Sequence, residues 1–215
     1  MEYFLLVPCA YLLGSIPFGV IVTRMTKGVD VRKYGSGNTG MTNVLRTAGL
    51  APGILVLVFD MSKAAVAVII ARAVSDSAGL EVAAALSTLI GHIWPVFIGF
   101  RGGRGTAPGY GALIAFSPFS GLAAAAAGLP LIGVFRYVSL GSIAGSTAGG
   151  VTLILLALFG YHSAVYALYA AVGVPIVLVK HRDNIKRLLA GEERKLGKAI
   201  EKHASQSQTE RAAGN

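Results

Sequence analysis

Residues 137–179 read YVSLGSIAGSTAGGVTLILLALFGYHSAVYALYAAVGVPIVLV, and none of them is Asp, Glu, Lys or Arg. A helix needs about 20 consecutive apolar residues to cross a bilayer, so this one stretch is long enough for two crossings. Charged residues are absent in the same way from 3–23, 82–100 and 105–135. The sequence therefore predicts an all-α polytopic membrane protein.

The composition of the whole chain supports the same fold class. Of the 215 residues, 54% are hydrophobic and only 13% are charged, and the mean hydropathy is +0.65. Because a soluble domain carries about 25% charged residues, this composition excludes a soluble globular protein, a disordered chain and a fibrous repeat. One cysteine, Cys9, and four histidines provide no zinc framework, and we expect neither a metal nor a cofactor.

The basic residues cluster beside the apolar stretches, at 24–46, 101–104 and 180–211. A net charge of +9 could suggest nucleic acid, but the positive-inside rule explains it, and we expect no nucleic-acid partner. With every cluster on the cytoplasmic side, the N-terminus lies outside and the C-terminus lies in the cytoplasm.

This orientation requires an odd number of crossings. We expect seven helical segments, with Ser117-Pro118 dividing 105–135 and Gly160–Ser163 dividing 137–179. Five spans, with 105–135 partly re-entrant, are the alternative. The seven segments are 3–23, 51–74, 80–99, 105–116, 119–135 and the two parts of 137–179.

A glycine-rich segment, YGSGNTG, lies at 34–40 on the cytoplasmic side. Its glycines flank Ser36 and Asn38, and glycine lets backbone N–H groups approach an anion closely. A phosphate-binding turn is one interpretation of this composition, and a flexible polar loop is the other.

The residues after this turn predict a short helix. Thr39, Thr42, Asn43 and Arg46 are spaced i, i+3, i+4, i+7, which places them on one polar face. A helix start is favourable for an anion, and Arg46 would add a bidentate donor. An interfacial helix without a ligand is the alternative.

A second cytoplasmic segment, GHIWPVFIGFRGGRG, covers 91–105. Arg101 and Arg104 flank Gly102-Gly103, so a turn here can present N–H and guanidinium groups to phosphate. The simpler interpretation is a pair of basic residues that end a membrane span.

A third segment, HRDNIKRLLAGEE, covers 181–193, and its Asn184 and Arg187 share one helical face. Taken alone, it is typical of a juxtamembrane basic helix that binds lipid headgroups.

Three ionisable residues lie inside apolar stretches, where they are costly and suggest function. His92 is either a hydrogen-bonded core residue or a functional group. Asp60 and Lys63, spaced i, i+3, either form a structural ion pair or line a polar cavity that opens to the cytoplasm.

Together these segments resemble the acyl-phosphate-dependent glycerol-3-phosphate acyltransferases of bacterial membranes, the PlsY type. The first signature is similar to SGNTGMTNVLRTAG at 36–49, and the third to NIKRLLAGEE at 184–193. The second is similar to GH, PVF and RGGRG within 91–105. Since the match reaches about Gly197, we expect one transmembrane domain over 1–197 and a polar, disordered tail over 198–215.

The resemblance implies a seven-helix enzyme of the bacterial inner membrane whose active site faces the cytoplasm. It implies transfer of a fatty acyl group from acyl-phosphate to the sn-1 hydroxyl of glycerol 3-phosphate, giving lysophosphatidic acid and phosphate. The expected partners are these two substrates and membrane lipids, and a monomer is compatible with the sequence.

The chain departs from the family pattern at two places. The family usually has Lys at the positions of Arg101 and Arg104, and Val-Ala-Thr where this chain has Thr106-Ala-Pro108. Arginine keeps the charge but not the geometry of lysine. A divergent paralogue that acylates another polyol phosphate is therefore an alternative, and a non-enzymatic small-solute transporter is another.

The chemistry requires two phosphate-bearing molecules to meet beside an acyl chain, so orientation and charge stabilisation should dominate. We expect His92 to orient or deprotonate the attacking hydroxyl, with Ser36 and Asn184 also in the catalytic set. The expected substrate- and phosphate-binding residues are Gly37, Asn38, Thr42, Asn43, Arg46, Lys63, Arg101, Gly102, Gly103, Arg104, Ser142 and Arg187.

Overall fold

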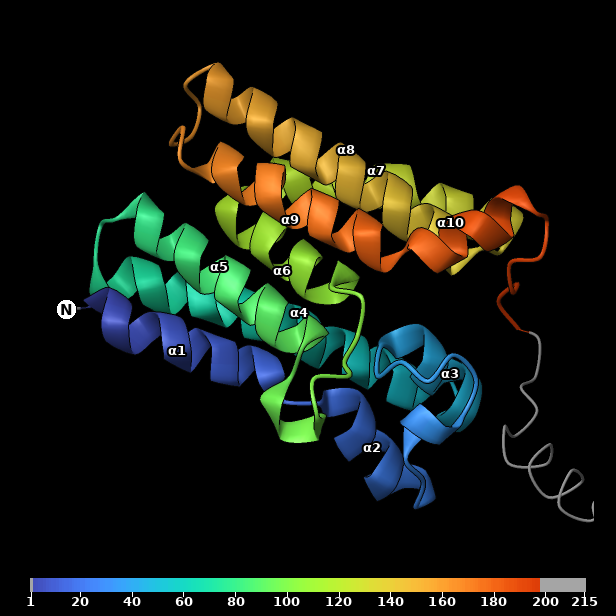
Figure 1. Cartoon of the computed structure of the whole chain (residues 1–215). Helices are drawn as coiled ribbons and strands as arrows, with labels where there is room; N and C mark the ends of the chain where they lie inside the picture. Colours follow the sequence, from blue (N-terminus) through green and yellow to red (C-terminus); the bar gives the residue numbers. More distant parts are fainter. Residues whose placement is uncertain (1, 198–215) are drawn as a thin grey trace, which may run out of the picture.

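A computed structural model describes residues 2–197 of the chain, and every regular element in that range is helical (Figure 1). The tail expected over 198–215 lies outside the described residues. In chain order the elements are α1 (Glu2–Ser15), α2 (Phe18–Lys27), η1 (Val31–Lys33), α3 (Met41–Ala48), α4 (Leu50–Val74), α5 (Ala78–Ile93), η2 (Val96–Ile98), α6 (Thr106–Phe116), α7 (Pro118–Phe135), α8 (Val138–Leu158), α9 (Tyr166–Lys180) and α10 (Arg182–Leu189).

Within residues 2–197, five segments are long and apolar enough to cross a membrane. The all-α membrane fold is therefore confirmed. The shorter helices α6 and α9 are also apolar. The five segments are Glu2–Lys27, Leu50–Val74, Ala78–Ile98, Pro118–Phe135 and Val138–Leu158.

The expected breaks between helices lie where the sequence places them. Ser75–Ser77 separates α4 from α5, and α7 begins at Pro118, directly after Ser117. Proline is favourable at the first position of a helix because its missing N–H would have no partner there. The loop expected at Gly160–Ser163 lies within 159–165, between α8 and α9.

Two expected spans are interrupted and are not continuous α-helices. The segment 3–23 is two helices, because α1 ends at Ser15 and α2 begins after Pro17. The segment 80–99 leaves the α-helix at Ile93, before Pro95. Proline removes an N–H donor and restricts the residue before it, so both breaks have the same cause.

The helices form two groups with α6 between them (Figure 1). Helices α1, α4 and α5 pack together on one side, and α7, α8 and α9 pack together on the other. Helices α4 and α6 approach closely at Gly111, where a Cβ atom would lie 2.0 Å from the Met61 carbonyl oxygen. Small residues permit such close helix packing in membranes.

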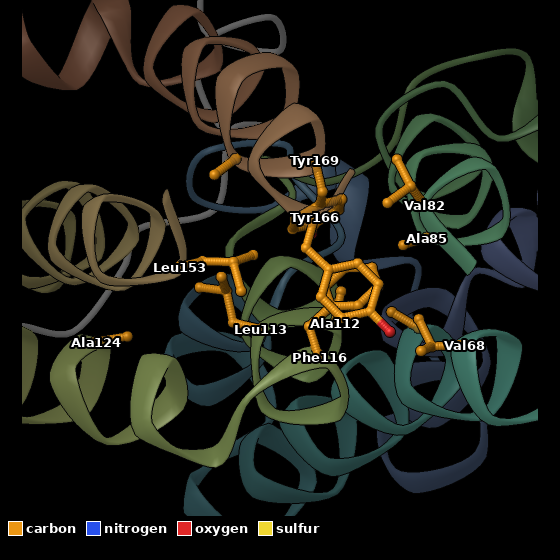
Figure 2. Close-up of a cluster of buried hydrophobic side chains, with 12 residues drawn as sticks. Val68, Val82, Ala85, Ala112, Leu113, Phe116, Ala124, Leu153, Tyr166 and Tyr169 are labelled. Carbon is orange, nitrogen blue, oxygen red and sulfur yellow. The ribbon is translucent and has the colours of Figure 1, made fainter. Parts of the chain in front are cut away.

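Aromatic side chains fill the centre between the two groups, as Figure 2 shows. The Phe116 ring of α6 lies 4.6 Å from the Tyr166 ring and 5.0 Å from the Tyr169 ring, measured between centroids. Leu113 and Leu153 complete this contact on the α7 and α8 side. The cluster holds α6 and α9 against each other.

Helices α3 and α10 lie at the end of the bundle opposite the N-terminus (Figure 1). Helix α2 and the loop between α5 and α6 lie toward this same end. The three polar segments singled out in the sequence are therefore brought to one end of an otherwise apolar bundle.

Candidate active site

The glycine-rich turn is held by the side chain of Asn43. The Asn43 Oδ1 atom accepts from the Ser36 N–H at 3.2 Å, and its Nδ2 atom donates to the carbonyls of Val31, Tyr34 and Asn38 at 2.9–3.1 Å. Asn43 is only 3% exposed. Its amide is thus used on the turn, and its direct binding of phosphate stays a prediction.

The turn itself has the backbone conformation that its glycines predict. Gly35 and Gly37 have φ angles of 57° and 70°, which are favourable for glycine and rare for other residues. Ser36, between them, is exposed. Helix α3 begins only at Met41, so Thr39 belongs to the loop and the predicted polar face of the helix is shorter.

Arg32 joins the first polar segment to the second. Its guanidinium donates to the Ile98 carbonyl at 3.2 Å and to the Asp30 carboxylate at 2.7 Å. The Arg32 hydrogen bond is the main reason that the pKa of Asp30 is lowered to about 2. Asp30 therefore stays ionised at neutral pH and keeps Arg32 in position.

Three arginines from three distant segments gather in one place. Burial is the main cause that lowers the pKa of Arg46 on α3 and of Arg104 before α6. The charge of Arg187 on α10 lowers both further, Arg194 lowers that of Arg46, and Arg46 lowers that of Arg104. Arginine stays cationic at neutral pH, and like charges crowded in this way favour a bound anion.

The carboxylate of Glu193 balances part of this charge, and Asp183 also acts on Arg104. The Glu193 Oε2 atom accepts from Arg187 Nε at 2.9 Å, and its Oε1 atom accepts from Asn184 Nδ2 at 2.8 Å. Asn184 is 3% exposed, and its Oδ1 atom has no hydrogen-bond partner among the described residues. Buried acceptors normally have a hydrogen-bond donor as partner, so this oxygen is available to a further donor.

His181 and Glu193 are the site residues that sequence reasoning missed. The His181 Nδ1 atom lies 2.8 Å from the Val177 carbonyl oxygen, and the side chain is buried. Burial is the main reason that the pKa of His181 is lowered to about 4, so the ring is neutral at pH 7. The sequence contains a signal for His181, because His181, Asn184 and Arg187 are spaced three residues apart. This spacing places them on one helical face.

Asp60, Lys63 and His92 form a buried cluster beneath the second segment. The Lys63 Nζ atom lies 2.9 Å from Asp60 Oδ1 and from His92 Nδ1, and it donates to the Gly14 carbonyl at 2.9 Å. The Ile16 carbonyl is a further, longer contact at 3.4 Å. The exposed fractions of the three side chains are 2%, 2% and 6%.

This geometry shows the contacts of Lys63 within the bundle. An ammonium has three N–H donors, and the surrounding acceptors use all of them. Two of these acceptors are the carbonyls of Gly14 and Ile16 at the end of α1. Lys63 thus forms a buried ion pair with Asp60, and its contact with a substrate stays a prediction.

His92 faces the glycine pair of the second segment. The Gly103 N–H donates to the His92 carbonyl at 3.1 Å, and a Cβ atom on Gly103 would lie 2.1 Å from His92 Nε2. Gly102 is equally confined, because its Cβ would lie 2.1 Å from the His92 carbonyl oxygen. Both glycines are required for the loop to fold back along the end of α5.

The structure leaves three expected residues outside these contacts. Within residues 2–197, Arg101 is exposed and makes none of the interactions that join the other arginines. Ser142 is buried on α8, and Thr42 lies half-buried on α3. Within residues 2–197, the hydrogen bonds of Glu193 run to Asn184 and Arg187 and not to either hydroxyl.

Apolar space lies between the helices below the arginines. A small cavity bounded by Gly109, Tyr169 and Val177 lies next to the residues that precede His181. A groove of about 200 Å³ between α8 and α9 shares Val174 with it. Both lie among residues of α8 and α9 that are mostly apolar.

Known proteins share both this sequence and this fold. The family model described as Glycerol-3-phosphate acyltransferase matches residues 4–191. Glycerol-3-phosphate acyltransferase 3 of Dehalococcoides mccartyi strain CBDB1 is 42% identical over 204 residues, covering 89% of this chain and 94% of that protein. The chain belongs to the glycerol-3-phosphate acyltransferase family. The family member of Thermoanaerobacter sp. strain X514 is also 42% identical, over 192 residues, with the same coverage.

Two solved structures of the family have the same fold. Both are of PlsY, an integral membrane glycerol 3-phosphate acyltransferase, in its glycerol 3-phosphate form and its lysophosphatidic acid form. Their TM-scores are 0.83 and 0.82, and both are 37% identical to this chain, covering 92% of it and 96% of PlsY.

The confinement of Gly103 leads to a test of the second segment. We expect Gly103→Ala to lower acyltransferase activity at least tenfold, because the new Cβ would displace His92 or the loop. Gly133→Ala is the control, since a Cβ there meets nothing within 4 Å and alanine favours helix. Equal activity of the two variants in the same detergent would show that the loop tolerates displacement.

Proposed function

We propose that this protein transfers a fatty acyl group from acyl-phosphate to the sn-1 hydroxyl of glycerol 3-phosphate. The new ester bond joins the glycerol oxygen to the acyl carbon, and the bond from that carbon to the phosphate oxygen breaks. The hydroxyl proton passes to the departing phosphate, so the products are lysophosphatidic acid and inorganic phosphate. The observation that supports this most is the convergence of Arg46, Arg104 and Arg187 beside Asn184.

We propose that the chain crosses the bacterial inner membrane seven times, with its N-terminus outside and its C-terminus and active site in the cytoplasm. Helices α1, α4, α5, α6, α7, α8 and α9 would be the crossings, within one domain over 1–197. The positive-inside rule supports this orientation, because the polar segments at one end of the bundle include Arg46, Arg104 and Arg187.

The arginines would bind the phosphate of glycerol 3-phosphate. Guanidinium groups form strong charge-assisted and often bidentate hydrogen bonds with phosphate oxygens. The open Oδ1 atom of Asn184 would accept from a glycerol hydroxyl and so orient it. The acyl-phosphate would lie against the glycine-rich turn, where Ser36, Gly37 and Asn38 present polar groups.

His92 would act as a positioning residue in this scheme. Its Nδ1 atom is held by Lys63, and its Nε2 atom faces the Gly103 backbone. With Nδ1 held in this way, the ring orients the end of α5, and the donor phosphate accepts the hydroxyl proton in this scheme. Because the cluster contacts α1, α4 and the Gly102-Gly103 turn, it would hold this turn in a fixed position relative to the two helices.

The acyl chain would occupy the apolar space between α6, α8 and α9. Gly109 and Val177 border its inner part, and Val177 lies one helical turn before His181. An alkyl chain gains roughly 0.8 kcal/mol for each buried CH₂ group, which holds the reactive end of the donor at the site.

The direct test of the proposal uses purified protein, palmitoyl-phosphate and labelled glycerol 3-phosphate. We expect a labelled lysolipid and one inorganic phosphate per turnover. Palmitoyl-CoA in place of the phosphate is the control for donor choice. Acylation of a different polyol phosphate in preference to glycerol 3-phosphate would identify a divergent paralogue, and no lysolipid with any acceptor would contradict the proposal.

Arg46 is expected to set the affinity for glycerol 3-phosphate. A hydrogen bond to a charged group contributes about 1.5–3 kcal/mol, so Arg46→Ala should raise the KM roughly 10- to 100-fold with a smaller effect on kcat. Arg182→Ala is the matched control, because Arg182 is exposed on α10. An unchanged KM for Arg46→Ala would remove this residue from the site.

Two substitutions of His92 separate positioning from proton transfer. His92→Ala should lower kcat by about 10²- to 10³-fold, comparable to losing one aligned donor. His92→Asn keeps a hydrogen-bonding group near the Lys63 ammonium and should recover at least tenfold of that loss. An Asn variant as inactive as the Ala variant would instead support His92 as the base.

A further inference from the structure

The residues after α10 pass the arginines and reach the turn between α7 and α8. We name residues 192–197 the strap. Glu193 bonds to Asn184 and Arg187 at its start, and the Arg194 carbonyl accepts from Arg46 Nη2 at 2.9 Å. The strap thus supplies acceptor groups to side chains of both α3 and α10.

The far end of the strap is bound to Arg136, in the turn between α7 and α8. The Leu196 N–H donates to the Arg136 carbonyl at 2.7 Å, and Arg136 Nη2 donates back to the Leu196 carbonyl at 2.7 Å. The Lys195 ammonium lies 5.7 Å from the centroid of the Tyr137 ring, within the range of a cation–π contact. Two reciprocal hydrogen bonds and one ring contact therefore join the strap to this turn.

Arg136 has an unusual backbone for its residue type. Its φ angle is 62° at the end of α7, where its N–H donates to the Ile132 carbonyl. Glycine or asparagine normally occupies such a left-handed position at a helix end. An arginine in this conformation indicates that an interaction of its side chain offsets the backbone strain. The hydrogen bond to the Leu196 carbonyl is that interaction.

We propose that Arg136 is a positioning residue for glycerol 3-phosphate, acting through the strap. The inference rests on the function proposed above and adds a residue outside the three polar segments. By holding Leu196, Arg136 keeps the Glu193 carboxylate and the Arg194 carbonyl in place. These groups in turn fix the directions of the Arg187 and Arg46 guanidinium groups, which would otherwise sample many rotamers.

The position of Arg136 predicts a particular kinetic effect. It contacts the strap and not the arginines, so its loss should weaken substrate binding more than the chemical step. A rise in KM with little change in kcat is the result expected when binding to the ground state and the transition state is lost equally.

The test compares two variants that each remove one of the two hydrogen bonds. Arg136→Gly removes the guanidinium while relieving the backbone strain, so loss of fold would not explain its effect. Leu196→Pro removes the N–H donor from the other side. We expect each to raise the KM for glycerol 3-phosphate 5- to 20-fold and to change kcat less than threefold, with Arg182→Ala unchanged.

Proteolysis provides a readout that does not depend on catalysis. Trypsin cleaves after Arg194 and Lys195, both within the strap. In the full-length protein, Arg136→Gly should increase cleavage at these two bonds at least fivefold, as measured by mass spectrometry. Added glycerol 3-phosphate should slow this cleavage in the wild-type protein, because a bound phosphate orders the arginines that the strap contacts.

The outcomes separate this inference from the proposed function. Unchanged KM and unchanged cleavage in both variants would overturn the role of Arg136, even if the wild-type protein makes lysolipid. A lower KM in the variants would also overturn it. That result would mean that the strap places Glu193 where its carboxylate competes with the substrate phosphate for the arginines. Absence of turnover in the wild-type protein would contradict the proposed function, while faster cleavage of the variants would still show that Arg136 holds the strap.

Discussion

The crowding of positive charge at one end of an apolar bundle is the constraint on which the rest of this structure depends. Guanidinium groups cannot lie in the hydrocarbon core without great cost, so they are placed where the helices end. Arg46, Arg104 and Arg187 are nevertheless partly removed from water, and burial lowers the pKa of the first two. Such an arrangement is stable only with acceptors around it, which here are Glu193 and backbone carbonyls.

The fold could be predicted from the sequence to a large extent, because the bilayer limits the possible structures. Backbone groups in hydrocarbon must be satisfied internally, so long apolar stretches become helices and their breaks fall at polar or proline-containing positions. Ser75–Ser77 and Ser117-Pro118 are examples. The break at Pro17 was missed because the flanking residues are apolar, and its stabilisation comes from Lys63, far away in the chain.

The same reasoning explains which site residues could be found and which could not. Residues with an unusual local pattern, such as Ser36 with its glycines or Asn184 with Arg187, stand out in the sequence. The role of Asn43 depends on four backbone groups that only the folded turn brings together. Glu193 and Arg136 were likewise not singled out, because their partners lie on other elements.

The carboxylate of Glu193 bears on how such a site can turn over. Three arginines without a nearby counter-ion would bind any phosphate tightly, including the inorganic phosphate that the proposed reaction releases. Glu193 lies 2.9 Å from Arg187 and offsets part of that charge, so binding and release of phosphate can both remain fast. Because Glu193 belongs to the strap, the position of one short segment sets both the direction of the guanidinium groups and the net charge that a substrate meets.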